Sequence, residues 1–332
     1  MIPFNYLDLA NVSENDTLEE TFKNSVKIAQ TVEENGFSRI WFAEHHNTVT
    51  VASSATSILI GHIAGKTKTI RVGSGGVMLP NHSPLVIAEQ FGTLATLYPN
   101  RIDLGLGRAP GTDQLTARYI NPNFRENAIQ FPERLRDLQQ FLSKDNASSM
   151  IRAIPGEGTE VPIWILGSST DSAYLASTVG LPYAFASHFA PAQMKMALDI
   201  YENNSIKKGF KPHKMIAINI VIGETNKDAE RIATSMYRMF LGLFRNERKP
   251  IQPPIETMEG FWSKEEEFQV KNMLKCSFIG DKNKVKKELE EFIEEYKPDE
   301  LIITAPAFSL EDKIYSVTEF AKIMRSINKR KY

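Results

Sequence analysis

Short apolar runs that alternate with helical segments constrain the fold of this chain more than any other feature. Eight runs are predicted to be strands, the first of them weakly, and most are apolar almost throughout instead of alternating with polar residues: residues 2–7, 39–43, 70–79, 102–106, 162–166, 183–187, 215–222 and 301–304. Strands of this kind are covered on both faces, as in a parallel sheet wrapped by helices. The pattern predicts an α/β fold, a (β/α)8 TIM barrel.

The segments between these runs carry helix signals. Thr17 and Glu20 have the spacing of a capping box and precede apolar residues at the helical period. Ser83 followed by Pro84 marks the start of another helix. The alternative fold, an open doubly wound sheet, requires a glycine-rich phosphate turn after the first strand, and residues 11–14 supply none.

One segment interrupts the alternation of strands and helices. The chain of 332 residues is expected to form a single TIM-barrel domain over residues 1–332, because such barrels often have this length when they carry insertions. Residues 244–274 contain three prolines followed by a charged stretch. Long insertions in compact domains are often lids, so residues 244–274 are expected to cover the barrel mouth; an inert surface excursion is the alternative.

Composition argues against several classes of partner. A formal net charge of -1 gives no long-range attraction to nucleic acid or to an anionic membrane. The first residues lack the features of a signal peptide, and no stretch approaches the ~20 apolar residues that span a bilayer. The single cysteine, Cys276, excludes an internal disulfide and fits a reducing compartment. We therefore expect a cytoplasmic protein.

Two clusters at predicted strand ends indicate an active site. Glu44, His45 and His46 follow the second strand, at the end where such barrels place their active sites. Imidazole titrates near neutral pH and suits proton transfer, whereas a metal site is not expected because adjacent strand residues point to opposite faces. Gly75 and Gly76 interrupt the third strand, which indicates a bulge, an unusual peptide geometry or close approach of a flat ligand.

Two further clusters would together hold a phosphate. Arg108 follows the fourth strand with a permanent, forked positive charge. Ser168 and Ser169 follow the fifth strand where a helix should begin, and they offer hydroxyls and free amides. Each has a structural alternative: the serines can be simple helix caps, and Arg108 can pair with Asp103 or Asp113.

Four stretches carry a resemblance to a known family: AEHHN at residues 43–47, VGSGGVMLP at 72–80, NRIDLGLGRAPGTD at 100–113, and WILGSS at 164–169 with GLPYAFASHF at 180–189. They resemble the bacterial luciferase-like flavin monooxygenases, and a weaker match, FIGD at 278–281, extends the likeness towards the end of the chain. The combination is specific to the superfamily, although no single motif is.

The resemblance implies a barrel that uses reduced FMN as a cosubstrate with dioxygen. A C4a-hydroperoxyflavin would then transfer one oxygen atom to a small organic substrate. His45 matches the family's catalytic acid or base beside the flavin, and Glu44 and His46 are expected to orient it. Gly75 and Gly76 match a non-proline cis peptide that lies against the flavin ring.

The resemblance also implies a phosphate site. Arg108 matches the phosphate-binding arginine and Ser168 a phosphate-binding serine, with Gly167 and Ser169 beside it, while Arg125 is a looser match to a second arginine. Luciferases proper have a glutamate where this chain has Gly167, so light emission is not expected.

The implied partners are a separate NAD(P)H:flavin reductase and a second copy of the chain in a homodimer. Two other functions remain open at this stage. One is a deazaflavin-dependent oxidoreductase that transfers hydride, and the other is a non-catalytic flavin-binding protein. Candidate substrates range from aldehydes to sulfur compounds and amines.

Overall fold

A ring of eight parallel strands forms the centre of the computed structural model, which describes residues 1–330. Pairing follows chain order from the first to the seventh strand, skips the eighth, and closes through the ninth back to the first. The predicted (β/α)8 barrel is confirmed. The strands are β1 (Phe4–Asp8), β2 (Arg39–Phe42), β3 (Arg71–Met78), β4 (Ile102–Gly107), β5 (Ile163–Gly167), β6 (Tyr183–Phe185), β7 (Lys214–Ile222), β8 (Ser277–Gly280) and β9 (Glu300–Thr304).

The strand β8 was missing from the predicted set. Within the described residues β8 pairs with β7 alone, along the C-terminal part of β7 from Asn219 to Ile222. The N-terminal part of β7, from Met215 to Asn219, pairs with β9 instead. The strand therefore forks at Asn219, whose side-chain amide donates to Ser277 Oγ (2.9 Å) and whose Oδ1 accepts from Thr304 Oγ1 (2.9 Å).

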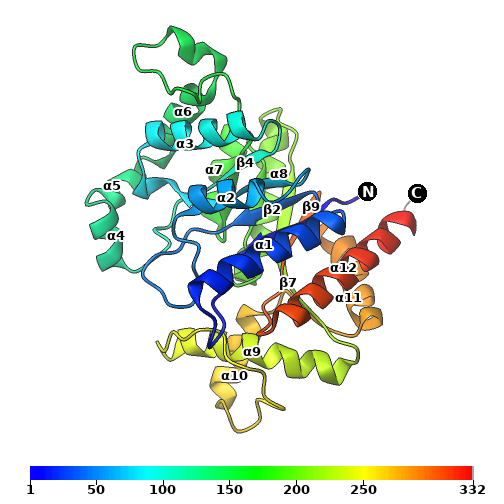
Figure 1. The fold of residues 1–332 in the computed structure, drawn as a ribbon. Coiled ribbons are helices and arrows are strands. Elements are labelled where there is room, and N and C mark those ends of the chain that lie inside the picture. The colour runs from blue at the N-terminus through cyan, green and yellow to red at the C-terminus, as the bar shows by residue number, and fades with distance from the viewer. Residues whose placement is uncertain (331–332) are drawn as a thin grey trace.

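Helices surround the ring (Figure 1). The capping box predicted at Thr17 and Glu20 is present at the start of the first helix. None of the described helices is long and apolar enough to cross a membrane. The helices are α1 (Leu18–Glu34), α2 (Thr56–Ala64), α3 (Pro84–Leu97), α4 (Gln114–Ile120), α5 (Phe124–Ile129), α6 (Phe131–Leu142), α7 (Thr170–Val179), α8 (Met194–Lys207), α9 (Asn226–Phe244), α10 (Lys264–Met273), α11 (Lys282–Tyr296) and α12 (Leu310–Arg330), with short 3-10 helices η1 (Leu79–Asn81), η2 (Lys144–Ser148) and η3 (Pro191–Gln193).

The predicted insertion at residues 244–274 is only partly irregular. Phe244 is the last residue of α9, and α10 occupies the C-terminal third of the segment, so the irregular part is residues 245–263. The helix α10 begins at a capping box formed by Ser263 and Glu266. This helix was not predicted, because the charged stretch was interpreted as part of the insertion. Residues 245–263 are anchored to the barrel, because Ile251 exchanges backbone hydrogen bonds with the loop after β1.

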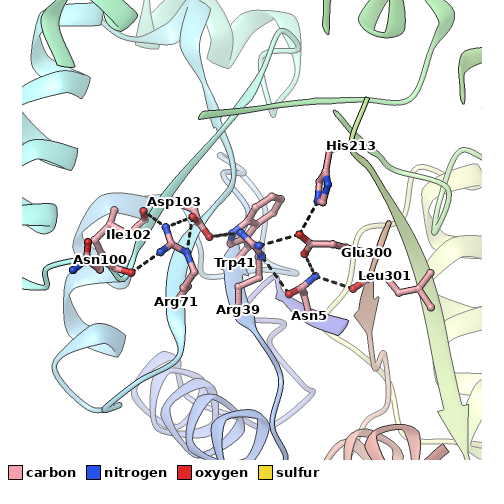
Figure 2. Close-up of polar contacts among 10 residues, drawn as sticks. All are labelled: Asn5, Arg39, Trp41, Arg71, Asn100, Ile102, Asp103, His213, Glu300 and Leu301. Carbon is pink, nitrogen blue, oxygen red and sulfur yellow. Dashed lines mark hydrogen bonds and ion pairs between the residues drawn. The ribbon is translucent and has the colours of Figure 1, made fainter. Parts of the chain in front are cut away.

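A buried charge network closes the N-terminal end of the barrel (Figure 2). Asp103 on β4 has no accessible surface. It accepts hydrogen bonds from Arg39 Nη1 (2.9 Å), Arg71 Nε (2.9 Å) and Trp41 Nε1 (3.2 Å). Arg39 also donates to Glu300 Oε1 (3.0 Å) at the start of β9. A carboxylate is stable in such a place only when cations and hydrogen bonds replace its water.

Two tryptophans lie against this network inside the ring. Trp41 and Trp164 pack edge to face with ring centroids 5.4 Å apart, and the Arg39 guanidinium carbon lies 5.1 Å from the Trp164 centroid. Together with Leu7 and Met215 they belong to a small apolar cluster within the barrel. The interior is therefore filled at the N-terminal end of the strands, and free space is left towards the C-terminal ends.

We expect Asp103→Asn to lower the free energy of unfolding by about 3 kcal/mol or more, because two arginines would lose their shared buried counter-charge. Urea denaturation near pH 7 measures the change. A matched control, Glu19→Gln, removes an exposed ion pair with Lys23 and should cost less than about 1 kcal/mol. Equal effects of the two substitutions would show that the network does not stabilise the barrel.

Candidate active site

A cavity of about 740 Å³ lies at the C-terminal end of the barrel. Leu7, Trp41 and Ile302 of the barrel interior contribute to its base. Loops that follow the strands form its walls, together with the end of α9 and residues 245–252. This volume is within the range of small-molecule sites, roughly 300–1,000 Å³.

Most of the predicted site residues line this cavity, although they come from different loops: His45, Gly75, Gly76, Arg108, Gly167, Ser168 and Ser169. The peptide bond between Gly75 and Gly76 is cis, as the resemblance implied. A Cβ on Gly76 would lie 2.6 Å from the carbonyl oxygen of Gly105, so β3 and β4 can approach this closely only with glycine there.

His45 places a neutral imidazole in the cavity wall. Burial lowers the pKa of His45, and the interaction of the ring with the Gly111 carbonyl opposes this effect only in part. The ring is therefore uncharged at neutral pH, so one of its nitrogens carries a proton and the other can accept one.

Glu44 and His46 are not among the residues that line the cavity, and their expected role of orienting His45 stays a prediction. The buried Glu44 carboxylate instead contacts Nε2 of His46 (2.9 Å) and Nε2 of His82 (2.9 Å). Side chains alternate in direction after a strand, so His45 faces the cavity while its two neighbours face the opposite side.

The Glu44 carboxylate joins three loops. It accepts a hydrogen bond from the Met78 amide (3.0 Å) at the end of β3 and one from Asn81 Nδ2 (3.2 Å). Asn81 also donates to the carbonyl of Pro110 (2.9 Å), next to the Gly111 that contacts His45. Burial acts to raise the pKa of Glu44, but its hydrogen bonds outweigh burial and lower the pKa to about 2. Glu44 is thus an anion that fixes the loops around His45.

Arg108 and Ser168 lie where an anion could bind. Arg108 Nη2 is 3.3 Å from Asp171 Oδ2, and both side chains are exposed, so this pair contributes little. Neither predicted partner pairs with Arg108, because Asp103 belongs to the charge network and Asp113 caps α4. Within residues 1–330 the Ser168 hydroxyl has no hydrogen-bond partner.

The two residues beside Ser168 shape the start of α7. Ser169 is the N-cap residue of α7, but its side chain makes no capping hydrogen bond. Its carbonyl accepts from the Ser172 hydroxyl at 2.6 Å. A Cβ on Gly167 would lie only 2.1 Å from that same hydroxyl oxygen, so this tight turn requires glycine.

Arg125 is the predicted cofactor residue that the structure does not bring to the cavity. It lies on α5 and donates to Gln114 Oε1, whereas Ala128 on the same helix lines the cavity.

Two groups of cavity residues were not assigned from the sequence. His188 follows β6 and lines the cavity, its Nδ1 is buried without a partner among the described residues, and burial with the nearby His45 lowers its pKa to about 3. Its position at a strand end could have identified it. The second group is cationic and belongs to α9 and the segment that follows it, where no strand end marks it. In the part of the chain that the structure describes, no cluster of His, Cys, Asp and Glu is suited to a metal ion.

A family model described as luciferase-like monooxygenase matches residues 2–297. The chain belongs to the luciferase-like monooxygenase family. The chain is 48% identical over 323 residues to the uncharacterized protein YvbT of Bacillus subtilis (strain 168), covering 96% of each chain. It is 45% identical over 317 residues to a luciferase-like monooxygenase of Escherichia coli (strain K12), covering 95% of each. The crystal structure of apo-MsnO8 is similar with a TM-score of 0.89 and 26% identity, covering 98% of this chain and 99% of that one.

Glu44→Gln should lower the free energy of unfolding by about 3 kcal/mol near pH 7, since a pKa lowered from 4.5 to about 2 stabilises the folded state by ~1.36 kcal/mol per unit. The folded pKa is depressed, so this stabilisation is complete above pH 4.5 and is lost as the pH falls through about 2. Urea titrations of both proteins at decreasing pH measure the difference. A difference that stays constant below pH 4.5 would contradict the assignment.

Proposed function

We propose that this protein is a flavin-dependent monooxygenase that uses reduced FMN and dioxygen to oxygenate a small organic substrate. The convergence of His45, the cis Gly75–Gly76 peptide, Arg108 and Ser168 on one cavity carries this proposal. The chain is 40% identical over 190 residues, 56% of its length, to the N-acetyl-S-alkylcysteine monooxygenase of Bacillus subtilis. It is 22% identical over 266 residues to the oxygenase component of a flavin-dependent trigonelline monooxygenase from Acinetobacter baylyi.

The residues at the cavity fit a flavin mononucleotide. The Arg108 guanidinium and the unpartnered Ser168 hydroxyl would hold the phosphate at the start of α7. The cis glycine pair presents backbone without side chains to the flavin ring, and a Cβ on Gly75 would collide with Leu7 Cδ1 at 2.7 Å. When bound in its reduced form, FMN supplies the electrons that activate dioxygen.

The chain's own residues would manage a proton and exclude water. His45 is neutral and borders the cavity, so its ring can hold a proton beside the oxygen atom that is transferred. The apolar base formed by Leu7, Trp41 and Ile302 keeps the reacting region dry. Residues of the segment 245–252 line the cavity, and we propose that this segment acts as its lid.

A separate NAD(P)H:flavin reductase would supply the reduced FMN. Support comes from the relative that is named as the oxygenase component of its enzyme, a term that implies a second component.

Arg108→Gln should weaken the binding of FMN at least about tenfold, because a hydrogen bond to a charged group contributes ~1.5–3 kcal/mol. Riboflavin lacks the phosphate, so its affinity should not change. Quenching of flavin fluorescence measures both affinities. Arg136→Gln, on an exposed arginine of α6, is the matched control and should bind both flavins as the wild type does. Equal losses for FMN and riboflavin would place the phosphate elsewhere.

Mixing the protein and photoreduced FMN with aerated buffer tests the reaction. The wild-type protein is expected to give a transient absorbance band to the blue of oxidised FMN that decays more slowly than free reduced FMN oxidises. His45→Ala should bind FMN normally but shorten the lifetime of this band by roughly 10²-fold, because the proton beside the reacting oxygen is lost.

The two arms of this experiment separate the alternatives. An absent band in the wild-type protein would favour deazaflavin-dependent hydride transfer or flavin binding without turnover. An unchanged lifetime in His45→Ala, with normal FMN affinity, would remove His45 from the chemistry.

A further inference from the structure

The rim of the cavity formed by α9 and the following segment is strongly cationic. Four positively charged side chains of this region line the cavity, Arg238, Arg245, Arg248 and Lys249, against one acid, Glu247. Such an imbalance beside an apolar interior attracts anions and raises their local concentration.

Three of these four cations are already partnered by the protein. Arg245 donates to both oxygens of Glu266, at 2.7 and 2.9 Å. Lys249 Nζ lies 3.3 Å from Glu247 Oε2. Arg238 donates to the carbonyl of Pro253 at 2.6 Å. These contacts link residues 245–263 to the neighbouring helices and occupy part of the donor groups of the three cations.

Arg248 differs from the other three cations. Within residues 1–330 it makes no hydrogen bond and no ion pair with another residue. It lines the same cavity as His45, and its positive charge helps to lower the pKa of that imidazole. Arg108, which we assign to the flavin phosphate, is paired with Asp171 at the start of α7 instead. The cavity thus has two separate arginines that could each bind an anion.

Below its charged rim, the cavity is lined largely by apolar side chains. Leu7, Trp41, Phe240 and Ile302 all border the same cavity. A ligand that fills it therefore needs an apolar body, and a planar carboxylate matches the forked donors of a guanidinium.

We propose that Arg248 binds the carboxylate of the organic substrate, so that the substrates of this site are small organic acids with an apolar body. The role of this anion site in oxygenation rests on the proposed function. Anion binding by Arg248 does not, and it is testable without turnover.

The test compares 4-phenylbutyrate with 4-phenylbutyramide, which has nearly the same shape but no charge. Calorimetric titrations use the full-length protein with and without oxidised FMN. The wild-type protein should bind the carboxylate at least about tenfold more tightly than the amide. In Arg248→Gln the two affinities should differ by less than about twofold, and Arg248→Lys should keep part of the preference because it retains a charge.

Lys249→Gln is the matched control, since Lys249 borders the same rim but is paired with Glu247. It should keep the preference for the carboxylate. The proposal is overturned if the wild-type protein shows no preference, or if the preference survives in Arg248→Gln.

Titration with FMN and riboflavin shows whether Arg248 binds the substrate carboxylate or the flavin phosphate. Arg248→Gln should leave both flavin affinities unchanged, and a loss for FMN alone would overturn the proposal by assigning Arg248 to the phosphate. If FMN does not bind the wild-type protein, the proposed function fails, whereas the comparison of carboxylate and amide in FMN-free protein still decides the role of Arg248.

Discussion

The buried carboxylate of Asp103 helps to determine which end of the barrel interior is filled by side chains and which end is left free. This carboxylate has no accessible surface, so its charge is tolerated only because Arg39, Arg71 and the Trp41 indole surround it. Arg39 and Arg71 are the first residues of their strands, and Trp41 and Trp164 pack beside them. Space that side chains leave free is consequently found at the opposite end, where the loops carry the reactive groups.

The position of His45 depends on a carboxylate that does not border the cavity. Glu44 contacts His46 and His82 and accepts the Met78 amide, which ties the loop after β2 to the end of β3. An anionic carboxylate with this many donors is difficult to displace, so the three loops behave as one rigid wall. The backbone next to His45 is thereby tied to the neighbouring loops, while His45 itself lines the cavity.

The barrel and the core of the site could be predicted because both follow from local patterns. Apolar runs indicate strands, and parallel strands bring their C-terminal ends together, which placed His45 and Arg108 at one cavity. The strand β8 was missed because it lies outside the regular ring and pairs only with the end of β7 beyond Asn219, among the described residues. The contact of Glu44 with His82 was also unpredictable, since it depends on loop conformations that no periodicity encodes.

The fork at Asn219 bears on how such a protein diversifies. A closed ring of eight strands encloses little more than its own side chains. Strand β9 ends at Thr304, and β7 continues past it to pair with β8, so the ring of eight strands is closed by hydrogen bonds only up to that level. The C-terminal part of β7, next to the cavity, and its N-terminal part, which is hydrogen-bonded into the closed ring, are thus separate along one strand. Substitutions of exposed cavity residues that follow α9, such as Arg248, should therefore change ligand preference at small cost in stability.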